Sequence, residues 1–236
     1  MCINTVTTKT LQELGAAKER VVKITPAVDQ RFLRDVSPAL VESTIQHFGL
    51  RQPYIIAVGR LIERKGFDTL IEAFSQLDQT KYATVKLVFV GDGPDRPRLS
   101  QVVAENYMQT SITFLGSVED RYLPALYTGA EFFALTPRDI RGDAEGFGIV
   151  YLEAAARGKP AVATNTGGVA EAVVHNATGL IVEADSPSAV KDALTSLLGD
   201  AVLRHRLGEQ ARARVQKEFL WEQRRQSLSD LLKPLL

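Results

Sequence analysis

The sequence predicts an α/β fold built on a doubly wound, Rossmann-like parallel sheet. Short apolar runs alternate with segments of helical periodicity, the order that right-handed crossovers between parallel strands produce. These runs are apolar at nearly every position, which is typical of strands that helices cover on both faces. Glycines follow several of the runs, where the carboxyl ends of the strands meet along one edge and where such sheets bind ligands.

The elements follow from these patterns in chain order. Strands are predicted at residues 54–58, 86–90, 112–115, 131–135, 160–163 and 179–182. Helices are predicted between them at residues 67–77, 97–107, 121–127, 149–157 and 186–198. Ahead of the first strand, helices are expected at 7–14 and 38–48, and a short strand at 21–24 before a proline. Residues 202–235 are expected to be mostly helical, with Trp221 as their single large aromatic anchor.

Composition limits the classes of function. The 236 residues suffice for one large α/β domain, and 28 basic residues balance 28 acidic ones. No overall field therefore attracts nucleic acid or an anionic membrane, and we expect no nucleic-acid partner. The one cysteine, Cys2, excludes an intramolecular disulfide and a cysteine-based metal site, and favours a cytoplasmic location. A run of about 18 apolar residues, as a spanning helix needs, does not occur.

Two carboxylates flank a glycine turn at the start of a predicted helix. Glu145 precedes the run Gly146-Phe147-Gly148, and Glu153 lies on the helix that follows. Unpaired amides and the positive end of the helix dipole favour an anion at such a turn. Glu145 is placed to accept hydrogen bonds from hydroxyl groups, or simply to stabilise the helix end. The combination indicates a phosphorylated sugar or a nucleotide sugar as ligand.

Glu153 has mostly apolar neighbours along its predicted helix. A carboxylate buried there requires a partner, because burying an uncompensated charge is costly. A ribose diol would serve, and so would an arginine or lysine from a neighbouring loop.

A basic loop follows the first predicted strand, from Gly59 to Gly66. Arg60 offers a planar fork that can hold two phosphate oxygens, and Lys65 offers a mobile point charge. Taken alone, the loop would be a solvated basic surface. Because it ends at the same sheet edge as the glycine turn, the two cations and the helix are expected to converge on one diphosphate.

An ordered set of motifs resembles a known family. It comprises Gly59 to Gly66, Gly91-Asp92-Gly93, Phe114-Leu115-Gly116, Glu145 to Glu153, Gly158 to Ala163, Gly167-Gly168 with Glu171, and Thr178 to Val182. In this order and at these intervals, the motifs are similar to the C-terminal, donor-binding half of the retaining glycosyltransferases of family 4, which have the GT-B fold. The resemblance covers roughly residues 5–230.

The resemblance implies roles for individual residues. Arg60 and Lys65 would hold the donor diphosphate, Glu145 would bind hydroxyls of the transferred sugar, and Glu153 would bind the ribose; Arg60, Lys65 and Glu145 are thus the expected catalytic residues. The remaining donor-binding residues would be Gly59, Gly91, Gly93, Gly116, Ser117, Val118, Gly146, Phe147, Gly148 and Ile149. It implies no metal and no cofactor besides the nucleotide-sugar substrate.

The segment from Pro137 to Ala144 suggests a branch within the family. It is longer than the usual link and, with the motif that follows, most resembles the phosphatidylinositol mannosyltransferases and related bacterial sugar transferases. This favours GDP-mannose as donor and leaves UDP-glucose and similar donors open. It also allows peripheral membrane contact at the inner face of the membrane in the full enzyme.

The resemblance also divides the chain. Residues 1–35 are expected to be a remnant of the interdomain crossover, 36–200 the donor-binding domain and 201–236 a helical tail. The acceptor-binding domain is then expected to be missing, so that the chain would be a fragment, a truncated reading frame or half of a split enzyme whose other half is a separate chain. An exposed apolar patch near the N-terminal edge would follow. The alternatives are a non-catalytic nucleotide-sugar binding module and a sugar-nucleotide epimerase.

Overall fold

The computed structural model describes residues 1–233, and its centre is one parallel sheet of six strands. The strand order is β3-β2-β1-β4-β5-β6, and every pairing in the sheet is parallel. The strands are β1 (Tyr54–Val58), β2 (Lys86–Val90), β3 (Ile112–Phe114), β4 (Phe133–Leu135), β5 (Ala161–Thr164) and β6 (Gly179–Val182). The predicted doubly wound, Rossmann-like fold is confirmed, and each predicted strand agrees with the structure to within two residues.

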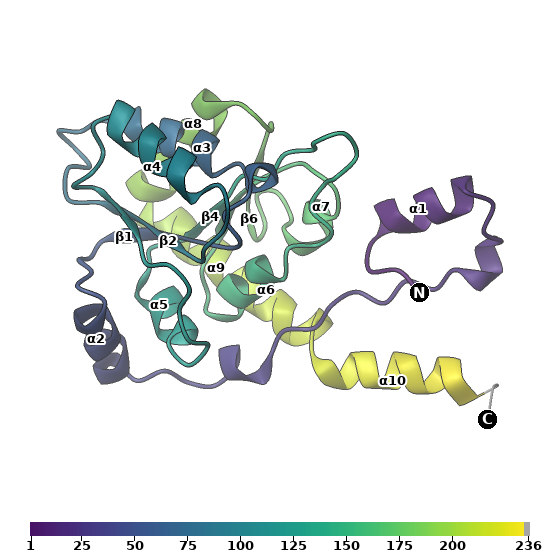
Figure 1. Cartoon of the computed structure of the whole chain (residues 1–236). Helices are drawn as coiled ribbons and strands as arrows, with labels where there is room; N and C mark the ends of the chain where they lie inside the picture. Colours follow the sequence, from purple (N-terminus) through teal and green to yellow (C-terminus); the bar gives the residue numbers. More distant parts are fainter. Residues whose placement is uncertain (234–236) are drawn as a thin grey trace.

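Helices cover both faces of the sheet (Figure 1). One face carries α3 (Phe67–Ser75), α4 (Arg96–Glu105) and α8 (Pro187–Gly199), which pack side by side. The other carries α2 (Pro38–His47), α5 (Leu123–Gly129), α6 (Ile149–Ala156) and α9 (Ala201–Glu218). A short helix that the sequence did not predict, α7 (Val169–Ala172), follows β5.

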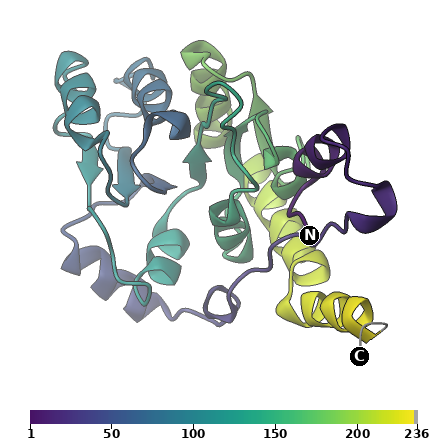
Figure 2. The same ribbon diagram turned by 45° about the vertical axis from the view of Figure 1, so that its right-hand side comes forward.

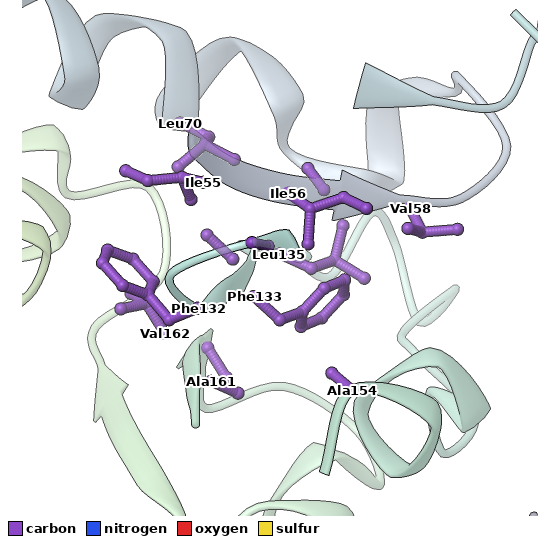
Figure 3. Packing of buried hydrophobic residues seen from close by; sticks show 14 of the residues in the cluster. Ile55, Ile56, Val58, Leu70, Phe132, Phe133, Leu135, Ala154, Ala161 and Val162 are labelled. Atoms are coloured by element: carbon purple, nitrogen blue, oxygen red, sulfur yellow. The ribbon is translucent and has the colours of Figure 1, made fainter. Parts of the chain in front are cut away.

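The core lies between the sheet and these two helical layers. Every residue of β1 is buried, as its continuous apolar run predicts. Figure 3 shows the packing: Leu70 of α3 meets β1 from one side, and Ala154 of α6 faces Phe133 and Ala161 from the other. Fully burying one such large side chain contributes roughly 1.5–3 kcal/mol, so this packing is a main source of the stability of the domain.

The two ends of the chain leave the body of the domain together (Figure 2). The N-terminal end carries α1 (Thr5–Glu13), which Asn4 caps by accepting from the Thr7 amide. The predicted strand at 21–24 is wrong: the structure has only an isolated bridge between Cys2 and Lys23, too short a pairing to extend into a ladder.

The long C-terminal helix is interrupted. It divides into α9 and α10 (Trp221–Leu232), because Leu220 is extended and the carbonyl of Phe219 accepts from the Val28 amide instead of continuing the helix. The prediction that Trp221 anchors this segment is also wrong. Phe219 is the buried aromatic, packed edge-on against Phe147, whereas Trp221 is 56% exposed.

Large exposed apolar side chains are prominent at both ends of the described chain. They include Met1, Ile3, Val6, Leu14, Trp221, Leu228, Leu231 and Leu232. The expected apolar exposure near the N-terminal edge is therefore present, and α10 shares it. Among residues 1–233, no helix is both long enough and apolar enough to span a bilayer.

Candidate donor-binding site

The candidate site lies at the topological switch point of the sheet. Strand order reverses between β1 and β4, and parallel α/β sheets bind ligands in the crevice that opens beyond such a point. The loop after β1 carries the basic run ending at Gly66, and the loop after β4 carries Glu145. The two sequence motifs predicted to meet are thus on the two strands that flank the crevice.

Lys65 and Glu145 form an ion pair across this crevice. Nζ of Lys65 lies 2.5 Å from Oε2 of Glu145, and the two side chains are only 12% and 9% exposed. A close pair at this burial interacts more strongly than a surface pair, because water screens it less. The structure therefore brings together two of the three residues predicted to be catalytic.

Arg64 also contacts Glu145, and sequence reasoning did not single it out. Its Nη1 lies 3.2 Å from the same Oε2 oxygen that Lys65 contacts, and its Nε lies 3.2 Å from Oδ1 of Asp143. The side chain is 17% exposed. In the sequence, Arg64 looks like any surface cation next to a lysine; only the folded loop shows that it points toward the carboxylate.

Arg60 does not join this cluster. Its side chain is exposed and makes no hydrogen bond or ion pair with any of residues 1–233. Lys65 therefore meets Glu145 and Arg60 does not, and the convergence of both cations on one diphosphate stays a prediction.

The basic loop is fixed at Gly66 by the end of β4. Gly66 has a φ of +63°, and a Cβ atom there would lie 1.9 Å from the carbonyl oxygen of Thr136. The hydroxyl of Thr136 donates to the Gly66 carbonyl at 2.7 Å. Lys65 is consequently held in register with the loop after β4, which carries Glu145.

The Glu145 loop rests on a glycine pair that follows β5. A Cβ atom at Gly167 would lie 2.1 Å from the carbonyl oxygen of Glu145, and the Gly168 amide donates to that oxygen at 2.8 Å. Asn4 donates from its side chain to the carbonyl of Gly146. In the sequence, Gly167 and Gly168 belong to the set of family motifs; in the structure they support the backbone that carries Glu145.

The predicted glycine turn does open onto a helix. Gly148 has a φ of +77° and is the N-cap of α6, which begins at Ile149. Among residues 1–233, no side chain caps this end: the Tyr151 amide donates to the Gly148 carbonyl at 3.0 Å, and the amides of Ile149 and Val150 have no acceptor. Phe147 is buried, so its side chain is not available to a ligand.

The other predicted glycines lie at the same edge, and two of them have a packing role. Cβ atoms at Gly91 and Gly93 would lie 2.1 and 2.2 Å from the carbonyl oxygens of Gly59 and Leu61. The loops after β1 and β2 therefore touch backbone to backbone. At Gly116 a Cβ atom would meet nothing within 4 Å.

The residues predicted to contact the base follow β3. Gly116 accepts at its carbonyl from the Gly91 amide, Ser117 is exposed, and Val118 packs against the core. They follow β3, which is two strands from β1 and on the opposite side of it from β4, and their contact with a base stays a prediction.

Glu153 lies in a separate cavity of about 250 Å³, lined also by Ile149, Arg31 and Trp221. Its carboxylate accepts a hydrogen bond from the Tyr127 hydroxyl at 3.0 Å. Burial raises the pKa of Glu153 to about 7, although this hydrogen bond lowers it in part. The buried carboxylate thus has a partner, as its surroundings required, but the partner is a tyrosine that no sequence pattern indicated.

Metal binding has no visible basis in the described residues. Across positions 1–233, no three histidine, cysteine, aspartate or glutamate side chains gather closely enough to hold a metal ion.

A parallel sheet in this strand order, with a buried cation–carboxylate pair at its switch point, defines a Rossmann-like ligand-binding domain. Residues 42–214 match the family model described as glycosyl transferases group 1. The chain belongs to this family of glycosyltransferases, which confirms the resemblance found in the sequence motifs.

Curated relatives agree with this assignment. The GDP-mannose-dependent alpha-(1-6)-phosphatidylinositol monomannoside mannosyltransferase of Mycobacterium tuberculosis is 35% identical over 211 residues, covering 88% of this chain and 54% of the relative. The D-inositol 3-phosphate glycosyltransferase of Corynebacterium glutamicum is 30% identical over 229 residues, covering 94% and 53%. The chain spans about half the length of the curated relatives it matches.

Solved structures share the fold. Anabaena Alr3699/HepE in complex with UDP and glucose superposes with a TM-score of 0.88 at 22% identity, covering 99% of this chain and 62% of that one. The C-terminal domain of the group 1 glycosyl transferase LpcC from Francisella tularensis gives 0.70 at 24% identity, covering 82% and 99%. The domain therefore has the architecture of one half of a GT-B glycosyltransferase.

Proposed function

We propose that this domain binds a nucleotide-diphosphate sugar as donor for a retaining glycosyl transfer, with GDP-mannose favoured over a UDP-linked sugar. The buried pair of Lys65 and Glu145 at the switch point carries the proposal, because it places a phosphate-binding cation beside a hydroxyl-binding carboxylate. The GDP-mannose-dependent relative, at 35% identity, supports the choice of donor. Retention of configuration follows from the family resemblance.

The groups around this pair suit a departing diphosphate. As the glycosyl bond breaks, negative charge grows on the phosphate oxygens, and cations and open amides fixed in advance stabilise it. Lys65 supplies the buried cation, the start of α6 supplies the amides, and Arg60 has the freedom to close over the phosphates from the surface.

The two carboxylates have separate tasks in this proposal. No donor among residues 1–233 hydrogen-bonds to Oε1 of Glu145, which leaves that oxygen for a sugar hydroxyl. Glu153 accepts from the ribose diol in its own cavity, where Ile149 forms an apolar wall. The base lies against the backbone from Gly116 to Val118.

The acceptor is bound by a second domain, on the same or a separate chain. This part of the proposal is motivated by the half-length coverage of the relatives and by the exposed apolar side chains of residues 1–14 and α10, which offer that domain a packing surface. We place the full enzyme in the cytoplasm, at the inner membrane face, because the relative in Mycobacterium tuberculosis is named for a phosphatidylinositol mannoside.

Replacing Lys65 tests the site directly. We expect Lys65→Ala to weaken binding of GDP about tenfold, or about 1.4 kcal/mol, because the cation that faces the diphosphate is lost. Isothermal titration calorimetry measures the change. Lys86→Ala is the matched control, since Lys86 begins β2 at the opposite end of the parallel sheet. Equal affinities for the Lys65→Ala and unaltered proteins would remove Lys65 from the donor site.

A transfer assay separates a donor-binding half from a self-sufficient enzyme. We expect purified residues 1–236 to bind GDP-mannose and to transfer no mannose to a phosphatidylinositol mannoside, because the residues that bind the acceptor belong to the second domain. Product formation, followed with radiolabelled donor, would show that these residues hold both substrates. Absence of donor binding would instead contradict the proposed function itself.

A further inference from the structure

Glu145 is held by two cations at a single oxygen. Lys65 and Arg64 both contact Oε2, at 2.5 and 3.2 Å, and Oε1 accepts from no group in the part of the chain that the structure describes. All three side chains are less than a fifth exposed. Either cation alone would neutralise Glu145, and the second acid that Arg64 contacts, Asp143, is 74% exposed.

When a donor binds, Lys65 is drawn from Glu145 to the diphosphate, and Glu145 then depends on Arg64. This inference rests on the proposed function. A diphosphate at Lys65 competes with Glu145 for the same ammonium, because phosphate oxygens and the carboxylate are both anions. If Lys65 were the only cation at Glu145, its departure would leave a carboxylate that is only 9% exposed without a partner, and a buried unpaired charge is costly. The carboxylate would then turn away from the sugar.

Arg64 is placed to prevent this. Its guanidinium spans two acids of one loop, with Nη1 toward Glu145 and Nε 3.2 Å from Asp143, although that second contact is not aligned as a hydrogen bond. Its carbonyl accepts from the Arg138 amide at 2.9 Å, which ties its backbone to the same loop. A planar, permanently charged group fixed in this way stays with the carboxylate after a flexible lysine has moved.

We propose that Arg64 is a positioning residue that keeps Glu145 aimed at the sugar when Lys65 engages the diphosphate. Arg64 then governs recognition of the sugar part of the donor, and Lys65 governs recognition of the nucleotide part. The exposed Asp143 holds the outer edge of the guanidinium and has a lesser effect.

The test compares a nucleotide with its sugar conjugate. Calorimetry on the full chain gives dissociation constants for GDP and GDP-mannose, and for UDP and UDP-glucose, with the unaltered protein, Arg64→Met and Arg64→Lys. We expect Arg64→Met to weaken binding of the nucleotide sugar about tenfold more than binding of the free nucleotide, and Arg64→Lys to retain most of the discrimination. Lys65→Met is the matched comparison and should weaken both ligands alike.

A double-mutant cycle distinguishes positioning from a structural role. With Glu145→Gln in place, adding Arg64→Met should change the dissociation constant of the nucleotide sugar by no more than about twofold, because the neutral amide forms no ion pair with Arg64. A tenfold further loss in that background, or equal losses for nucleotide and nucleotide sugar, would overturn the role of Arg64 alone. Absence of binding of both nucleotides to the unaltered protein would overturn the proposed function and this inference with it.

Discussion

Gly66→Ala is expected to lower the free energy of unfolding by about 3 kcal/mol or more, the largest effect of any single substitution considered for this chain. The added Cβ would lie 1.9 Å from the carbonyl oxygen of Thr136, in a backbone conformation with φ +63° that side chains rarely adopt. The end of β4 and the basic loop would have to move apart. Urea-induced unfolding followed by circular dichroism measures the change.

Gly116→Ala is the matched control for backbone conformation. Gly116 also has a positive φ, +72°, but an added Cβ there would meet nothing within 4 Å. Its cost should be the conformational strain alone, about 1–2 kcal/mol. Equal losses in the two variants would mean that the close approach of Gly66 to Thr136 does not hold in solution.

Glu153→Gln is expected to stabilise the protein at neutral pH and above. In the folded state the pKa of Glu153 is raised from the usual 4.5 to about 7, mainly by burial. Below pH 4.5 both states carry the proton. Between pH 4.5 and 7 the unfolded chain releases it while the folded protein still holds it, so stability is lost until the folded carboxyl ionises at about pH 7. The loss is on the order of 3 kcal/mol, and glutamine avoids it while still accepting from Tyr127.

The measurement is the difference in free energy of unfolding between Glu153→Gln and the unaltered protein, at several pH values. Taking the difference removes the other titrating groups, which both proteins share. The difference should grow between pH 4.5 and 7 and level off above. A difference that is flat over this range would show that Glu153 is not desolvated. In the same range, nucleotide binding by the unaltered protein should strengthen as Glu153 ionises.

The helices and strands could be predicted because their burial is reflected in the pattern of apolar residues along the sequence. Strands covered on both faces are apolar throughout, and β1, β2 and β6 match their predicted limits. The interruption between α9 and α10 was not predictable, since it depends on a hydrogen bond between Val28 and Phe219, far apart in the sequence. The anchor was misjudged for the same reason: the larger aromatic at 221 is exposed and its neighbour at 219 is buried.

The site was predictable in its outline and less so in its contacts. Topology alone brings the loops after β1 and β4 together, so the meeting of Lys65 and Glu145 follows from the strand order. Arg64 and Tyr127 carry no pattern in the sequence, because a side chain's direction depends on the packing of its loop. The glycines at 91, 93 and 167 contact the backbone of neighbouring loops. The sequence could not distinguish this role from contact with a ligand, because both require a residue without a side chain.

The hydrogen bond between the Val28 amide and the Phe219 carbonyl has a mechanical consequence. It joins the segment that follows α1 to the segment that precedes α10, and Asn4 and Lys23 fasten the same N-terminal part of the chain to Gly146 and to Glu171 of α7. A force applied to the N-terminal segment would therefore reach the loop that carries Glu145 through Asn4.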